Sequence, residues 1–189
     1  GSGYDLVWNL YDEAGNNWNG TRRYDIIYDA TPPTISAITT TENPTTGTKK
    51  LNDNVQFTIN FSEKVTADGT MTVTLTSTNT AATATVTSSN IDESLTADVT
   101  YQVATDNISD HLNITGIEMA TGKFLTDAAG WQMSAPFTIS GANLNQVSNF
   151  EIDGKIPTIT NITSNSGDPG RFSTGDPVDV RVNFSEAVS

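Results

Sequence analysis

The stretch that decides the fold is residues 55–65, with the sequence VQFTINFSEKV. Apolar and polar side chains alternate along its first seven residues, which is the period of a β-strand. Val55, Phe57, Ile59 and Phe61 should therefore all point to one side. We expect this strand to lie in a two-sheet antiparallel sandwich, with those four side chains turned into the core.

The same pattern returns 123 residues later, as VDVRVNFSEAV at residues 178–188. A second echo joins DATPPTI at 29–35 to DGKIPTI at 153–159, and a third joins DEAGN at 12–16 to DAAGW at 127–131. Self-similarity of this kind, in the same order along the chain, predicts a repeated module.

The echoes divide the chain into three parts. We expect residues 1–29 to be the C-terminal strands of one repeat, 30–153 a complete repeat, and 154–189 the N-terminal strands of a following repeat. The sequence would then begin and end inside repeats, and neither partial repeat should be stable alone, because two strands rarely hold together in water.

Within the complete repeat, short alternating segments separated by turn residues predict an all-β fold with no convincing helix. The predicted strands lie at residues 34–40, 55–61, 71–76, 82–87, 95–103, 112–118 and 137–140, the last continuing toward residue 152. Seven strands in about 120 residues fit a sandwich of the immunoglobulin type.

Composition excludes several classes of function. The 189 residues contain 22 acidic and 9 basic side chains, for a formal charge of −13, so nucleic acid is not an expected partner. No apolar run reaches the roughly 20 residues of a membrane span. Cysteine is absent, which excludes disulfides and thiolate chemistry. The only histidine, His111, has no cysteine partner and no Gly-x-Ser-x-Gly motif, so we do not expect an enzyme.

Several motifs carry a resemblance to a known family. They are PTI at 33–35, the FSEKV block at 61–65, Tyr101 with Val103 and then Asp106-Asn107, and the Asp-x-Ala-Gly turn at 127–130. In this order they resemble the immunoglobulin-like tandem repeats of large bacterial surface proteins and adhesins. The resemblance implies an extracellular or cell-surface location and a role in cell adhesion. Trp131 departs from the pattern, because such repeats usually carry asparagine after Ala-Gly.

Acidic residues should gather at the two ends of the complete repeat. Glu63 closes a strand and Asp127 opens a turn, and the loop order of a sandwich places both beside the incoming linker with Asp29. By the same argument, the loop that carries two further acids should approach the outgoing linker and the next repeat. The acids expected at that end are Asp106, Asp110, Asp153 and Glu186.

This layout is similar to that of cadherins, whose calcium ions hold domain junctions rigid. Calcium is therefore the candidate ion for both groups, since it prefers carboxylate and carbonyl oxygens. The alternative left open is that Asp127 and Asp153 only form Asx turns and that Glu63 is solvated.

The tryptophans suggest either sugar stacking or packing. Trp8 alternates with leucines and is expected in a core. Trp18 and Trp131 lie near loops that should face a neighbouring domain, and we favour packing between domains as their role.

These observations predict a structural or adhesive spacer that extends a chain by stacked repeats. Its partners would be neighbouring repeats of the same or another chain, and cell-surface glycan or protein. Two alternatives stay open: a glycan- or ligand-binding module of an adhesin, and a filament subunit completed by strands from a neighbouring chain.

Overall fold

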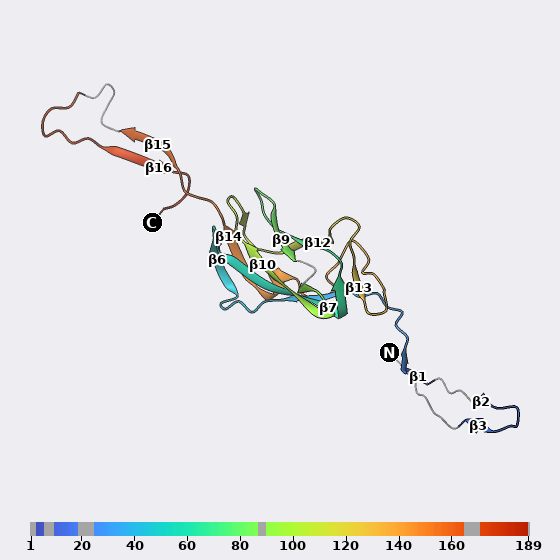
Figure 1. Cartoon of the computed structure of the whole chain (residues 1–189). Helices are drawn as coiled ribbons and strands as arrows, with labels where there is room; N and C mark the ends of the chain where they lie inside the picture. Colours follow the sequence, from blue (N-terminus) through green and yellow to red (C-terminus); the bar gives the residue numbers. More distant parts are fainter. Residues whose placement is uncertain (1–2, 6–9, 19–24, 87–89, 165–170, 189) are drawn as a thin grey trace.

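The structure is a computed structural model that describes residues 3–5, 10–18, 25–86, 90–164 and 171–188 (Figure 1). It is mostly β-sheet, with several antiparallel sheets, so the all-β prediction is confirmed. A central body carries most of the strands, and smaller hairpins extend from its two ends. None of the described helices is long and apolar enough to cross a bilayer.

The first sheet is built around β7 (Asn54–Ala67), which contains the stretch that decides the fold. It pairs with β5 (Ile35–Thr39), β10 (Ser94–Gln102) and β13 (Leu125–Asp127), and all three pairings are antiparallel. Val55, Phe57, Ile59 and Phe61 are at most 5% exposed, so the prediction that they share one buried face is confirmed.

A second sheet consists of β8 (Met71–Leu75) between β9 (Ala82–Val86) and β12 (Ile114–Met119). Buried side chains from this sheet and from the first belong to one continuous hydrophobic cluster. The two sheets therefore bury their apolar faces against a shared core, which is how a two-layer β-fold removes apolar surface from water.

A third sheet closes one end of the body and corrects the predicted strand set. Here β14 (Asn149–Asp153) pairs antiparallel with β11 (Ile108–Ser109) and parallel with β6 (Thr46–Lys50). The sheets are thus not purely antiparallel. Neither β6 nor the parallel pairing was expected, because the sequence TGTKK of β6 has no apolar alternation and its side chains are largely exposed.

Two further differences lie just before β14. Residues 137–140 do not form a strand: Ile139 makes only an isolated bridge to Ile35, and Ser140 donates its N–H to the same residue. A single helical turn, α1 (Leu144–Val147), follows, and Asn143 caps it. Four residues are too short to produce a helical period in the sequence, but the turn buries Leu144 completely.

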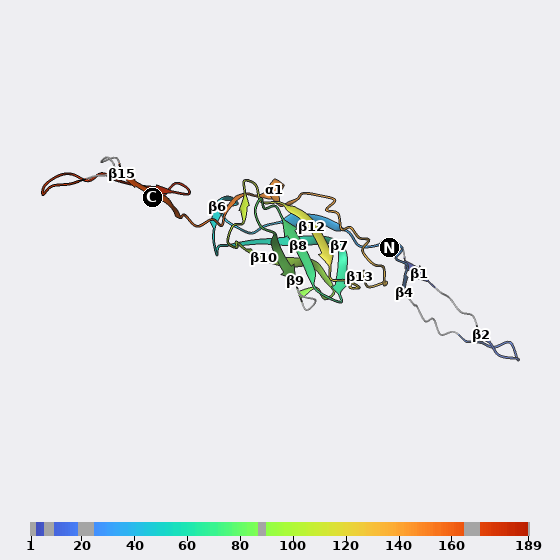
Figure 2. The same cartoon turned by 90° about the horizontal axis from the view of Figure 1, so that it is seen from above.

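Hairpin-like pairs lie beyond the two ends of the body, as the two views agree (Figures 1 and 2). At the N-terminal end, β1 (Gly3–Asp5) pairs with β4 (Asp25–Ile27), and β2 (Leu10–Tyr11) pairs with β3 (Asn17–Trp18). At the C-terminal end, β15 (Ile159–Ser164) pairs with β16 (Val180–Phe184).

The β15–β16 pair has the register of the β5–β7 pair. Ile35 lies opposite Phe61, and Ile159 lies opposite Phe184, with the register shifting at the next residue in both pairs. Thr34 and Ser62 exchange two hydrogen bonds, of 2.9 Å each, from the Thr34 N–H to Ser62 Oγ and from the Ser62 N–H to the Thr34 carbonyl. Thr158 and Ser185 exchange the same two, at 2.9 and 2.8 Å. Equivalent sequence positions thus make equivalent contacts.

Candidate metal centre

Three carboxylates meet where the incoming linker reaches the central body. Asp29 lies in the linker between β4 and β5, Glu63 lies in β7, and Asp127 ends β13. One side-chain oxygen from each lies within 4.8 Å of the others. The fold explains the meeting, because β13 pairs with β7 at Asp127 and Val65, while the Thr34–Ser62 hydrogen bonds hold the linker against β7. The sequence had placed these three residues together.

Asp127 is the most buried of the three, at 7% exposed. Its Oδ1 accepts a hydrogen bond of 2.8 Å from the Trp131 backbone N–H. Its Oδ2 is buried and has no hydrogen-bond partner. A buried carboxylate oxygen without a partner carries a desolvation cost of about 1–3 kcal/mol or more, so this atom calls for a cation or another donor.

Asp29 is fixed by its own turn. Its Oδ1 accepts from the Thr31 N–H at 3.0 Å and from Thr31 Oγ1 at 2.9 Å. These two hydrogen bonds lower the pKa of Asp29, and a side-chain hydrogen bond with Glu63 lowers it further. Asp29 therefore stays charged while it faces the other acids.

Glu63 is the carboxyl of this cluster whose pKa is raised. Burial raises its pKa, and the negative charges of Asp29 and Asp127 raise it further. The side-chain contact between Glu63 and Asp29 raises the pKa of Glu63 and lowers the pKa of Asp29. A divalent ion would remove the repulsion between these carboxylates at neutral pH.

The cluster is open to solvent on the linker side. A hollow of ≈ 670 Å³ is lined there by Tyr28, the linker residues 29–32, Thr34, Ser62 and Glu63. Backbone carbonyls and water can therefore complete the oxygen ligands of an ion that takes 6–8 of them. Three carboxylates with one unpartnered buried oxygen fit calcium or a similar hard cation.

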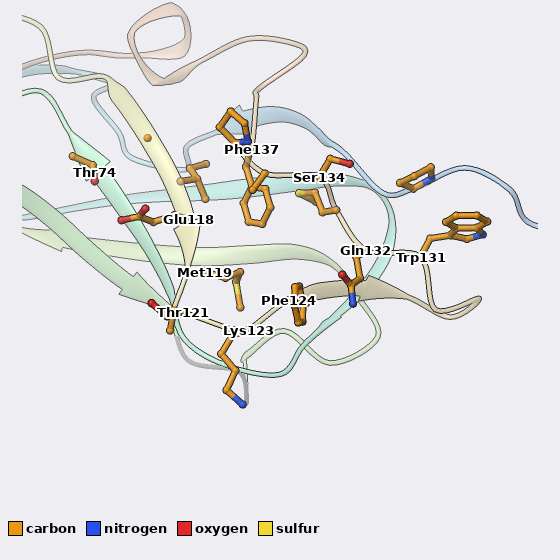
Figure 3. Close-up of a pocket in the computed structure, with 18 of the residues that line it drawn as sticks. Thr74, Glu118, Met119, Thr121, Lys123, Phe124, Trp131, Gln132, Ser134 and Phe137 are labelled. Atoms are coloured by element: carbon orange, nitrogen blue, oxygen red, sulfur yellow. The ribbon is translucent and has the colours of Figure 1, made fainter.

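A larger hollow of ≈ 1230 Å³ lies beside this site, between β12 and residues 130–137 (Figure 3). Met119, Phe124 and Phe137 face it, and Glu118 and Lys123 lie at its rim. Phe124 is 43% exposed. The lining of this larger hollow is chiefly apolar. Among the described residues it includes no group of three metal-ligating side chains, so the candidate metal site is the acid cluster instead.

The four acids expected at the outgoing linker are not brought together in the same way. Among the described residues, the three-carboxylate cluster at the incoming linker is the only such group. Asp106 approaches the outgoing linker through its backbone, whose N–H donates to the Gly154 carbonyl at 3.1 Å, and Asp110 is exposed. Asp153 forms an Asx turn with the Lys155 N–H, which was the alternative interpretation.

Asp153 and Glu186 nevertheless share one hollow at that end. In the sequence echoes Asp153 corresponds to Asp29 and Glu186 corresponds to Glu63, and Glu186 Oε1 is buried with no hydrogen-bond partner. The outgoing linker therefore carries two residues of the cluster type.

The tryptophans are placed only in part. Trp131 is 45% exposed, and its ring N–H donates to the Asp29 carbonyl at 2.9 Å, so it contacts the linker, while packing between neighbouring units stays a prediction. The Trp18 side chain and the whole of Trp8 lie outside the described residues.

Sequence reasoning missed two residues of the centre, Thr31 and Ser62. Thr31 orients Asp29, and Ser62 ties the linker to β7. The signal for Thr31 was the Asp-x-Thr spacing, which favours an Asx turn. The signal for Ser62 was its return as Ser185 in the second echo.

Neither family models nor curated proteins nor solved structures give a match to this chain.

Proposed function

We propose that this chain is an extracellular spacer made of tandem immunoglobulin-like β-sandwich repeats, and that a calcium ion held by Asp29, Glu63 and Asp127 stiffens the junction before the central repeat. The observation that carries the spacer is the repetition of contacts at both linkers. The Thr34–Ser62 and Thr158–Ser185 pairs fasten each linker to the strand that follows it. A module joined to its neighbour by the same contacts at each end extends a chain by addition.

The exposed face of the β15–β16 pair supports the same proposal. Ile159, Ile162 and Phe184 are 44–60% exposed, whereas their counterparts Ile35, Ile38 and Phe61 are at most 5% exposed. Two strands with an apolar face do not hold alone in water. In the proposed function, further strands of the same module cover this face, as the β8 sheet covers β7 in the central body.

The unpartnered Asp127 Oδ2 supports the ion. Asp29 comes from the linker, whereas Glu63 and Asp127 come from the central body, so an ion bound by all three ties the linker to the body. Two prolines at 32–33 already favour an extended path. In this proposal the ion limits the remaining rotation of the linker on the N-terminal side of these prolines. In this proposal the chain lies outside the cell, where calcium is plentiful.

The ion is tested by thermal unfolding of the whole chain with calcium and with chelator. At a free calcium concentration of 100 times Kd, binding stabilises the folded state by about 2.7 kcal/mol. For a cooperative unit of this size we expect a rise in Tm of about 10 °C. Asp127→Asn should abolish the rise, and the exposed Asp110→Asn should keep it. Equal melting of the parent chain in calcium and in chelator would reject the ion.

The Asp127→Asn variant also separates a binding role from a structural one. In chelator it should be at least as stable as the parent chain, because it removes a negative charge that faces Glu63 and keeps the Oδ1 acceptor for Trp131. A large loss of stability in chelator would mean that Asp127 serves the fold only.

The extracellular spacer is tested separately. Antibodies against this chain should label intact, unpermeabilised cells of the source organism or their culture medium. Labelling that requires permeabilisation would contradict the proposed location.

A further inference from the structure

Two turns of this chain have the same backbone hydrogen bonds. In the turn Asp12–Asn16, the Asp12 N–H donates to the Asn16 carbonyl at 3.1 Å, and the Asn16 N–H donates to Asp12 Oδ1 at 2.8 Å. In the turn Asp127–Trp131, the corresponding distances are 3.0 and 2.8 Å. Gly15 and Gly130 take the same positive φ, +83° and +88°. The two turns thus share their backbone hydrogen bonds and differ in their side chains.

The side-chain difference decides what happens to the second carboxylate oxygen. Asn16 Nδ2 donates to Asp12 Oδ2 at 2.8 Å, so both oxygens of Asp12 are occupied. This side-chain hydrogen bond is also the largest cause of the lowered pKa of Asp12. Trp131 has no amide to offer, and Asp127 Oδ2 is left without a partner although Asp127 is 7% exposed.

The one polar atom of the Trp131 side chain is used elsewhere. Its Nε1–H donates to the Asp29 carbonyl at 2.9 Å. Figure 3 shows the ring beside the linker and turned away from Met119 and Phe137. Trp131 therefore contacts two of the three cluster residues: its backbone N–H donates to Asp127, and its ring N–H donates to Asp29.

We propose that the residue after Ala-Gly determines whether the turn aspartate can bind the cation, and that Trp131 is a residue that leaves the aspartate able to bind it. An asparagine caps the second oxygen, as in the first turn. A tryptophan leaves that oxygen free and, through its ring N–H, holds the backbone of the linker residue Asp29 beside the turn. Trp131 is a positioning residue, since it acts through Asp127 and Asp29 and does not itself bind the ion. This inference rests on the proposed calcium site.

The test compares Trp131→Asn with Trp131→Phe by isothermal titration of the whole chain with calcium. In Trp131→Asn the amide should cap Asp127 Oδ2, so the charge-assisted hydrogen bond must break before the ion binds. We expect Kd to rise about tenfold or more. In Trp131→Phe no amide competes and only the ring N–H is lost, so the rise in Kd should be about threefold. Asn16→Ala, which alters the capped turn, is the matched control and should leave Kd unchanged.

Stability in chelator separates positioning from packing. If Trp131 only packs against the linker, both variants should lower Tm in chelator and leave Kd as in the parent chain, and that result would overturn the inference. If the parent chain binds calcium and the Trp131→Asn variant binds it with the same Kd, the role of Trp131 would also be overturned, while the calcium site would stand. A parent chain that shows no binding would overturn both.

Discussion

Replacing Asn107 with alanine should destabilise the central body by about 2–5 kcal/mol. Asn107 is 1% exposed, and its Oδ1 accepts hydrogen bonds from Tyr101 Oη at 2.8 Å and from the Ala104 N–H at 3.1 Å. Its Nδ2 donates to Thr80 Oγ1 at 2.6 Å. It thereby joins the end of β10 to the segments before β9 and β11, three parts of the chain that no single strand pairing connects.

The magnitude follows from the groups that alanine leaves behind. Tyr101 is 1% exposed, so its hydroxyl cannot turn to water and costs about 1–3 kcal/mol when orphaned. The Ala104 N–H and Thr80 Oγ1 belong to exposed residues and can be hydrated, so each loses about 0.5–1 kcal/mol. The matched change is Tyr101→Phe, which removes the hydroxyl and leaves Asn107 Oδ1 its second donor; it should cost about 1 kcal/mol.

The assay is urea unfolding of the whole chain, with the free energy extrapolated at constant m-value. In the double variant no orphaned hydroxyl remains. Its loss should therefore be smaller than the sum of the single losses by about 1 kcal/mol. Strict additivity, or a cost below 1 kcal/mol for Asn107→Ala, would refute the buried network as a source of stability.

Three further predictions concern charge and packing. Phe57→Ala should cost about 3–5 kcal/mol in urea unfolding because it opens a cavity between the sheets, whereas the exposed neighbour change Gln56→Ala should stay within about 0.5 kcal/mol. Burial raises the pKa of Glu42, but the ammonium of Lys49 at 2.6 Å and the Gln56 N–H outweigh burial and lower it. The stabilisation by Glu42 is therefore complete above pH 4.5 and lost as pH falls through the lowered pKa, so Glu42→Gln should cost about 1 kcal/mol at pH 7 and nothing in acid. Burial raises the pKa of Tyr101 to about 12, so the folded state holds this proton longer than the unfolded state, and stability should fall between pH 10 and 12 in the parent chain but less in Tyr101→Phe.

The strands of the core could be predicted because their signal is local. Period-two alternation in residues 55–61 placed four side chains in the core, and Val65 and Ala67 continue the alternation to the observed end of β7. The polar strand β6 could not be found in this way. It is a strand because the backbone of β14 pairs with it from about 100 residues away, and such a pairing leaves no apolar pattern in TGTKK.

The acid cluster could be predicted for a different reason. The loop order of a sandwich put Asp29, Glu63 and Asp127 at one end of the repeat, and the three do meet. One detail was wrong: Glu63 does not close its strand, because β7 continues to Ala67, and Glu63 meets Asp127 through the pairing of β7 with β13. Which oxygen is free does not follow from the loop order. That depends on whether the side chain after Ala-Gly can reach Asp127, and the sequence showed Trp131 only as a departure from the usual asparagine.

The position of Asp29 along the linker limits what an ion at this site can do mechanically. Thr34 is already tied to Ser62 without any ion, and two prolines precede it, so the path from residue 32 onward is set by the fold. An ion bound to Asp29 therefore acts on the short stretch before those prolines, where Thr31 and the Trp131 ring now hold Asp29. Small-angle scattering should thus show a change in the angle between the N-terminal strands and the central body. The dimensions of the body itself should be the same in calcium and in chelator, and a body that expands in chelator would contradict a junction role for the ion.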